Sequence, residues 1–252
     1  MEKFALAALG SIPWVGGFIS AAASMKTDDR DLQQETLQTR WLEEHTTKMR
    51  QLEESLENIW QRFESLGERI DERIQSKEYL ALVAEAFRTW DSAETEEKRG
   101  YVRNLIANAA GTRVCSDDVV RLFIDWLNLY HEAHFAVIRE VHQNPGATRY
   151  DVWSVLYGDV VREDSAEADL FKLLFRDLSA GGVIRQERET TSDGRFVRKR
   201  PPARRSGVVS STMESAFEDT KPYEVTELGR QFVHYTMNEV VQQIGGEAQP
   251  RS

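Results

Sequence analysis

Two histidines are the side chains whose spacing first suggests chemistry. The run His131-Glu132-Ala133-His134 resembles the His-Glu-x-x-His motif of zinc proteases, but it has one residue between the glutamate and the second histidine, where the motif has two. In the protease motif, the two intervening residues place both imidazoles one helical turn apart, and the glutamate acts as the base. No third ligand is visible nearby in the sequence. We therefore interpret both as core or boundary histidines beside the apolar stripe of a packed helix, and we predict no metal site.

The chain has one cysteine, Cys115, at the expected start of a helix, where the helix dipole could lower a thiol pKa. A single cysteine excludes an intrachain disulfide and a cysteine-based zinc site, and we interpret it as structural in a reducing cytosol. No phosphate loop, dinucleotide fingerprint or Gly-x-Ser-x-Gly elbow occurs, and no pair of carboxylates is singled out. The sequence thus predicts a protein that is not an enzyme and has no cofactor.

Charge is distributed unevenly along the 252 residues. The net charge of −10 disfavours a chain built as a whole for nucleic acid. Residues 28–72 have a net charge of −7, whereas residues 185–205 have a net charge of +5. The residues there that could follow a phosphate backbone or approach anionic lipid are Arg195, Arg198, Lys199, Arg200, Arg204 and Arg205. A solvated basic loop explains the same charges equally well.

A seven-residue repeat of apolar side chains organises the segment 27–75. The expected seam consists of Leu42, Met49, Leu52, Leu56, Ile59, Phe63, Leu66 and Ile70. Alternating steps of three and four residues are typical of a coiled coil or a long bundle helix. Trp60 and Phe63 indicate packing on the same chain as well, so an intramolecular bundle and a dimeric coiled coil both remain open. In the second case the partner is another copy of the chain or another protein.

The first 26 residues form an apolar segment, uncharged from residue 4 to residue 24. Three interpretations are open. The segment could be a transmembrane span, although Pro13 and three glycines argue against it, or a secretory signal, although its n-region has no net positive charge. The third interpretation is an apolar hairpin or helix that lies on a bilayer or packs on the protein itself. The residues expected to contact a membrane are Phe4, Leu6, Leu9, Ile12, Trp14, Val15, Phe18 and Ile19.

The remaining chain predicts a helical bundle and a small terminal module. Residues 76–145 favour three more helices, the last running from residue 116 through residue 141. In the module, 146–244, the expected elements are helices at 148–157 and 165–178, strands at 183–188 and 223–226, a basic wing over 185–222 and a helix from 227 to about 244. Residues 245–252 are expected to form a disordered tail. We predict a mainly α fold: a long heptad-patterned helix plus a helical bundle, followed by a C-terminal winged-helix domain with a small β-wing.

The charge of the expected recognition helix argues against nucleic acid. With its approach it contains five carboxylates and two bases, a net charge of −3, which should repel phosphates. The residues counted are Glu163, Asp164, Glu167, Asp169 and Asp177 against Lys172 and Arg176. A nucleic-acid partner is therefore disfavoured in this interpretation.

Three stretches carry a resemblance to a known family. They are Tyr101-Val102-Arg103-Asn104-Leu105-Ile106-Ala107-Asn108-Ala109, Leu178-Ser179-Ala180-Gly181-Gly182-Val183-Ile184 and Tyr223-Glu224-Val225-Thr226-Glu227-Leu228-Gly229-Arg230-Gln231-Phe232. Together they resemble the bacterial abortive-infection alpha (Abi-alpha) family over residues 50–240. The resemblance implies a role in anti-phage defence, in which an infected cell stops growing or dies, and it supplies no catalytic residues.

Two functions follow as expectations. The first is a non-enzymatic anti-phage protein that acts through protein–protein contacts and at a membrane surface, in the cytoplasm or associated with the inner membrane. The alternative is a winged-helix, DNA-binding transcriptional regulator that dimerises through the long helix.

Overall fold

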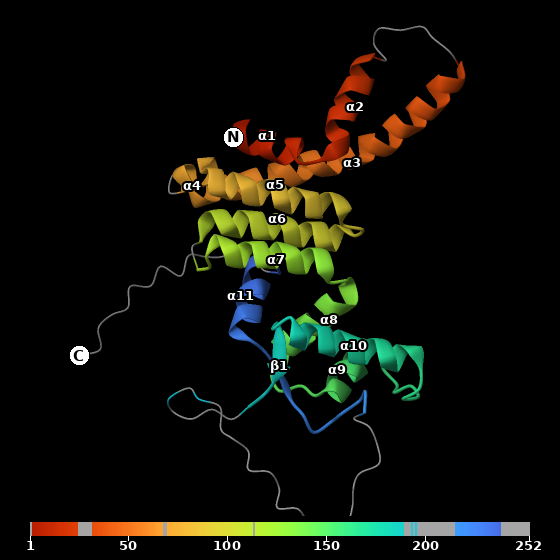
Figure 1. The fold of residues 1–252 in the computed structure, drawn as a ribbon, viewed down its shortest axis with the longest axis vertical. Helices are drawn as coiled ribbons and strands as arrows, with labels where there is room; N and C mark the ends of the chain where they lie inside the picture. Colours follow the sequence, from red (N-terminus) through yellow and green to blue (C-terminus); the bar gives the residue numbers. More distant parts are fainter. Residues whose placement is uncertain are drawn as a thin grey trace, which may run out of the picture. The chain divides into compact units, whose positions relative to one another are not determined.

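The chain is mainly helical, as the sequence predicts. We describe a computed structural model for residues 2–24, 32–67, 70–112, 114–188, 193, 195 and 215–237, without the side chains of residues 24 and 32–39. Within these ranges there are eleven helices and a two-stranded sheet (Figure 1). The chain divides into two compact units, one of Met1–Leu129 with Val233–Ser252 and the other of Tyr130–Phe232.

The first unit is a stack of helices that includes one long helix. Its helices are α1 (Glu2–Gly10), α2 (Pro13–Ser24), α3 (Leu32–Leu66), α4 (Asp71–Gln75), α5 (Lys77–Ser92), α6 (Glu96–Gly111) and α7 (Asp117–Leu129). Helix α5 packs against α1, α6 and α7, and α3 packs against α6. Polar caps fix two of the starts, because Ser76 Oγ accepts from the Tyr79 N–H and Thr95 Oγ1 from the Lys98 N–H, each at 3.3 Å.

The long helix is shorter than the seam predicts. Helix α3 ends at Leu66, and Ile70 and Ile74 belong to the next turn and to α4, although both are buried. Gly67 causes the stop, because its φ of +71° is the left-handed conformation that closes a helix. Its N–H donates to the carbonyls of Phe63 and Glu64.

The seam packs on its own chain where its side chains are described. Leu42, Leu52, Ile59 and Phe63 are buried, and Met49, Leu56 and Leu66 are half-buried. The ring of Phe63 contacts that of Phe4 edge-on, with 5.3 Å between centroids. Ser55 Oγ, fully buried on α3, accepts from the indole N–H of Trp90 on α5 at 3.1 Å. The buried seam residues of α3 therefore pack within the first unit.

The expected single helix from residue 116 through residue 141 is two helices. Helix α7 ends at Leu129, and α8 (Glu132–Gln143) begins after His131, whose backbone is extended with φ −92° and ψ 170°. The His131 N–H donates to Nδ1 of His134 at 3.2 Å, which satisfies the amide at the break. The apolar stripe continues across the break, which is why the sequence pattern alone indicated one helix.

The second unit contains helices and strands close to those expected at 148–157, 165–178, 183–188 and 223–226. It comprises α8, α9 (Arg149–Leu156), α10 (Ala166–Ala180), β1 (Ile184–Gln186), β2 (Tyr223–Val225) and the first part of α11 (Glu227–Thr236). The strands are antiparallel, with Ile184 opposite Val225, Arg185 opposite Glu224 and Gln186 opposite Tyr223. Gly229 lets α11 lie against the turn before β1, because a Cβ there would come within 2.2 Å of the Val183 carbonyl oxygen.

The last residues of α11 belong to the first unit. Two amides of α6 satisfy its final carbonyls: Asn104 Nδ2 donates to the Thr236 carbonyl at 2.7 Å and Asn108 Nδ2 to that of Tyr235 at 2.9 Å. The expected continuation of this helix to residue 244 and the expected tail at 245–252 lie outside the described residues.

The apolar N-terminal segment is divided between buried and exposed side chains. Phe4, Ile12 and Val15 are buried within the first unit, while Leu6 and Ile19 are 62% and 58% exposed. Leu9, Trp14 and Phe18 are half-buried. Within the described ranges no single helix is long and apolar enough to cross a bilayer; α1 and α2 pass that test only together, and a bend of 98° separates them.

Candidate functional site: a basic cleft

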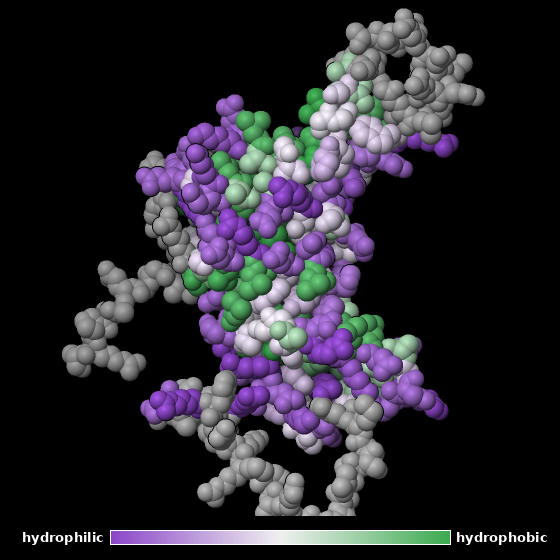
Figure 2. Space-filling view, viewed as in Figure 1, coloured by the Kyte–Doolittle hydropathy of each residue, from purple (hydrophilic) through white to green (hydrophobic). Residues whose placement is uncertain are grey.

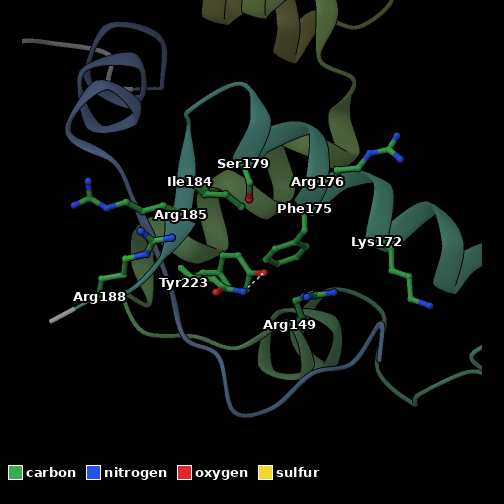
Figure 3. A pocket seen from close by; sticks show the side chains of 10 residues that line it. Arg149, Lys172, Phe175, Arg176, Ser179, Ile184, Arg185, Arg188 and Tyr223 are labelled. Carbon is green, nitrogen blue, oxygen red and sulfur yellow. Dashed lines mark hydrogen bonds between the residues drawn. The ribbon is translucent and has the colours of Figure 1, made fainter. Parts of the chain in front are cut away.

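A cleft in the second unit brings together cationic side chains that are far apart in the sequence. Its volume is about 560 Å³. Its lining consists of Arg149, Lys172, Phe175, Arg176, Ser179, Ile184, Arg185, Gln186, Arg188 and Tyr223. Figure 3 shows Arg185 and Arg188 on the strand side, Lys172 and Arg176 on the helix side, and Arg149 close to the rings of Phe175 and Tyr223. None of the described lining residues is acidic.

One face of α10 forms the helix side. Lys172, Phe175, Arg176 and Ser179 are spaced by three and four residues, so they lie on one face of the helix. Ser165 starts this helix, because its Oγ accepts from the Ala168 N–H at 3.1 Å. The carboxylates Glu167 and Asp169 of the same helix are exposed and do not line the cleft.

The two strands and two aromatic rings form the opposite wall and the floor. Gln186 and Tyr223 are paired across the sheet, and Gln186 Nε2 donates to the Tyr223 hydroxyl at 3.4 Å. The Tyr223 ring packs edge-on against Phe175, with 4.8 Å between centroids. Phe175, Ile184 and Tyr223 are buried, so the floor is apolar and rigid beneath the charges.

Arg149 is the buried cation of the cleft, 8% exposed. It is the first residue of α9, whose start is fixed by Thr148 and Asp151 in a reciprocal capping box. Hydrogen bonds from Thr148 hold the pKa of Asp151 below its usual range, so this cap stays anionic. The Arg149 guanidinium donates from Nη1 to the Ser215 carbonyl at 3.2 Å and lies 5.9 Å from the centre of the Tyr223 ring.

Carboxylates next to the cleft interact with its cations, and Glu218 does so with Arg149. Lys172 Nζ lies 3.5 Å from Glu163, and Arg185 Nε lies 2.7 Å from Glu224. Arg176, with a side chain 74% exposed, lies 3.5 Å from Asp177. Solvated ion pairs of this kind contribute little stability, so an anionic ligand can exchange for the carboxylates at small cost.

Glu163 also anchors the segment that leads into β2. Burial raises its pKa, but hydrogen bonds from the Ala216 N–H and the Ser215 hydroxyl, together with Lys172, outweigh burial and hold the pKa below its usual range. The carboxylate accepts from the Ala216 N–H at 2.9 Å. The Glu163 carboxylate and the Arg149 guanidinium therefore both bond the segment 215–216.

Of the cationic residues expected from sequence, the structure describes Arg195. Arg195 is exposed and does not line the cleft. Arg198, Lys199, Arg200, Arg204 and Arg205 lie outside the described residues. Sequence reasoning missed Arg149, Arg185 and Arg188 as members of a site, because they are dispersed over 40 positions; the spacing of Lys172 and Arg176 by one helical turn was the available signal.

The two histidines differ in environment. His131 is exposed at the start of α8, which differs from the expected place beside the stripe, whereas His134 is buried and stacks on Tyr130. Burial lowers the pKa of His134, although Asp177, with Oδ2 3.9 Å from Nε2, acts in the opposite direction. Across the described ranges, no three His, Cys, Asp or Glu side chains lie close enough to hold a metal ion.

Cys115 lacks the environment of an activated thiol. Burial raises its pKa, against the lowering that a helix start could produce, and a hydrogen bond with Tyr235 only partly offsets burial. Its backbone N–H donates to the Tyr235 hydroxyl at 3.3 Å, next to the Thr112 hydroxyl, which donates to the same oxygen at 3.0 Å. These contacts fit a structural residue.

Comparison with known proteins identifies no relative of this chain. The chain matches no protein-family model, no curated protein and no solved structure.

Proposed function

We propose that the protein is a non-enzymatic binding protein in which residues 130–232 act as a winged helix that binds nucleic acid through the basic cleft. The order of α8, α9, α10, β1, β2 and α11 supports the winged-helix assignment, with α10 in the place of the recognition helix. The observation that carries the proposal is that five cationic residues from three parts of the chain line one cleft.

The position of the charges supports a polyanion as partner. Lys172, Arg176 and Arg185 have partly exposed side chains, and Arg188 is exposed, so these four can contact phosphates that remain solvated. They lie on both sides of the cleft, as a backbone with repeated charges requires (Figure 3). The acidic residues of α10 that make its total charge negative are absent from the described lining.

Binding of a fluorescent oligonucleotide by the full chain tests the proposal. The double variant Lys172→Ala/Arg176→Ala should weaken binding and reduce the slope of log K against log salt by about one for each phosphate that the variant no longer binds. The matched control is Arg162→Ala/Arg230→Ala, which removes the same charge from two residues of the same unit outside the cleft. Equal weakening in both variants, or no binding by the wild type at low salt, would reject the cleft as a nucleic-acid site.

We propose membrane contact through α1 and α2 as a second function. The supporting observation is that an uncharged segment exposes Leu6 and Ile19 on the surface of the first unit. In Figure 2 the surface over α2 is pale or green rather than deep purple. Because Phe4, Ile12 and Val15 are buried, the contact would use the exposed face without removing the segment from its core.

Sedimentation with lipid vesicles tests this second function. Leu6→Gln/Ile19→Gln should abolish co-sedimentation of the full chain. Val114→Gln/Leu129→Gln, which changes two side chains of similar exposure in the same unit, should leave it intact. A wild-type protein that stays in the supernatant would dismiss membrane contact.

The biological setting we propose is anti-phage defence in the cytoplasm or at the inner membrane. Its support is the resemblance of residues 101–109, 178–184 and 223–232 to the Abi-alpha family. Expression of the wild-type chain should lower the plating efficiency of a sensitive phage, and the cleft variant Lys172→Ala/Arg176→Ala should restore it. Unchanged plating across a broad phage panel would argue against this setting.

A further inference from the structure

The cations of the cleft fall into two environments. Four are exposed or half-exposed, whereas Arg149 is 8% exposed and lies against the buried Tyr223 ring. Its bond to the Ser215 carbonyl fixes the orientation of the guanidinium. A duplex backbone contacts outer side chains, so the buried arginine has no evident role in that mode of binding.

We infer that the inner end of the cleft binds a phosphomonoester, the terminal phosphate of a nucleic-acid strand or of a nucleotide, with Arg149 as its main contact. This inference rests on the proposed function of the cleft and specifies its ligand. An internal phosphate has one negative charge and is flanked by two sugars. A terminal phosphate has a single ester bond, three free oxygens and, at neutral pH, a charge approaching −2.

The surroundings of Arg149 fit such a group. A guanidinium presents planar, forked donors that match two phosphate oxygens, and the low polarity of the Phe175 and Tyr223 rings strengthens that interaction. Ser179 and Gln186 add neutral polar groups to the lining. The volume of about 560 Å³ lies within the range of small-ligand sites, so a nucleotide has room. The outer cations would then contact the strand that follows the terminal phosphate.

Two single strands of one sequence, one with a 5′-phosphate and one with a 5′-hydroxyl, form the direct test. Each has a 3′ fluorophore, and binding is followed by anisotropy with the full chain. The phosphorylated strand should bind about tenfold more tightly, the effect of one charge-assisted contact in a buried setting. Arg149→Gln should remove this preference, whereas Arg185→Gln should weaken both strands and keep the preference.

Competition provides a readout that does not depend on the Arg149 variant folding. Adenosine monophosphate should displace the phosphorylated strand from the wild-type protein and adenosine should not. A phosphorylated strand that binds more tightly than the monophosphate identifies a chain end as the ligand; the reverse order identifies a free nucleotide.

The outcomes separate this inference from the proposed function. Equal affinity for the two strands, with both weakened by Lys172→Ala/Arg176→Ala, would overturn the terminal-phosphate site and leave nucleic-acid binding intact. Binding of neither strand would overturn both. Displacement by adenosine as well as by its monophosphate would also contradict recognition of the phosphate.

Discussion

Arg185 and Glu224 face each other across the two strands of the sheet, with 2.7 Å between Arg185 Nε and Glu224 Oε1. The guanidinium lines the cleft, while the carboxylate does not. The pair therefore keeps a cation in place and at the same time competes with any anionic ligand for it.

Removing that competition should strengthen binding. We expect Glu224→Gln to raise the affinity for an oligonucleotide by about twofold to fivefold, since a partly solvated ion pair is worth about 0.5–1 kcal/mol. Anisotropy titrations at low salt measure the change. Glu227→Gln removes the same charge from a carboxylate on α11 outside the cleft, so it should have a smaller effect. A Glu224→Gln protein that binds more weakly would show that the carboxylate positions Arg185 more than it competes.

The close approach at Gly229 should make the second unit sensitive to a single methyl group. The added Cβ of Gly229→Ala would meet the Val183 carbonyl oxygen at 2.2 Å and Val225 Cγ1 at 2.7 Å. We expect the free energy of unfolding to fall by about 1–3 kcal/mol, the usual cost of overpacking. Gly100→Ala is the control in the first unit, where the nearest atom is the end of the Arg103 side chain at 3.5 Å. Urea denaturation should show that this control is neutral or stabilising by up to about 1 kcal/mol.

Stability should depend on pH through His134. Because burial lowers its pKa in the folded protein, the unfolded chain binds a proton at higher pH than the folded one. The contribution of His134 is therefore fully present above its unfolded pKa of about 6.5 and is lost as pH falls through the folded value. His134→Asn keeps a side-chain acceptor for the His131 N–H and cannot titrate, so its denaturation midpoint should fall less between pH 7.5 and pH 5.5. An equal fall of the denaturation midpoint in the wild type and in the variant would contradict a lowered pKa of His134 in the folded protein.

Local patterns in the sequence were sufficient to predict most helices but not where two of them break. The expected seam from Leu42 to Leu66 lies on one helix and is partly buried, yet Ile70 continues the spacing beyond the stop at Gly67. The break at His131 could not be predicted for the same reason. Helices α7 and α8 both have buried apolar side chains, so the apolar spacing in the sequence continues from one helix to the next. The periodicity of apolar residues indicates which side chains are buried. It does not reveal a turn between two helices when the residues on both sides of the turn remain buried.

The cleft was beyond sequence reasoning for a different reason. The total charge of α10 and its approach is negative, but only Lys172 and Arg176 among the charged residues of that segment line the cleft, while Glu167 and Asp169 are exposed elsewhere on the helix. Arg149 comes from another helix, and its place beside Tyr223 depends on tertiary packing. A summed charge says nothing about which face of a helix a ligand meets.

Hydrogen–deuterium exchange of the full chain, with and without a single-stranded oligonucleotide, tests the central claim most directly. We predict slower exchange on binding in residues 172–179 and 184–188, with little change in α5 and α6. Protection confined to the first unit, or unchanged exchange in 172–188 while the oligonucleotide is bound, would contradict the assignment of the basic cleft as the binding site.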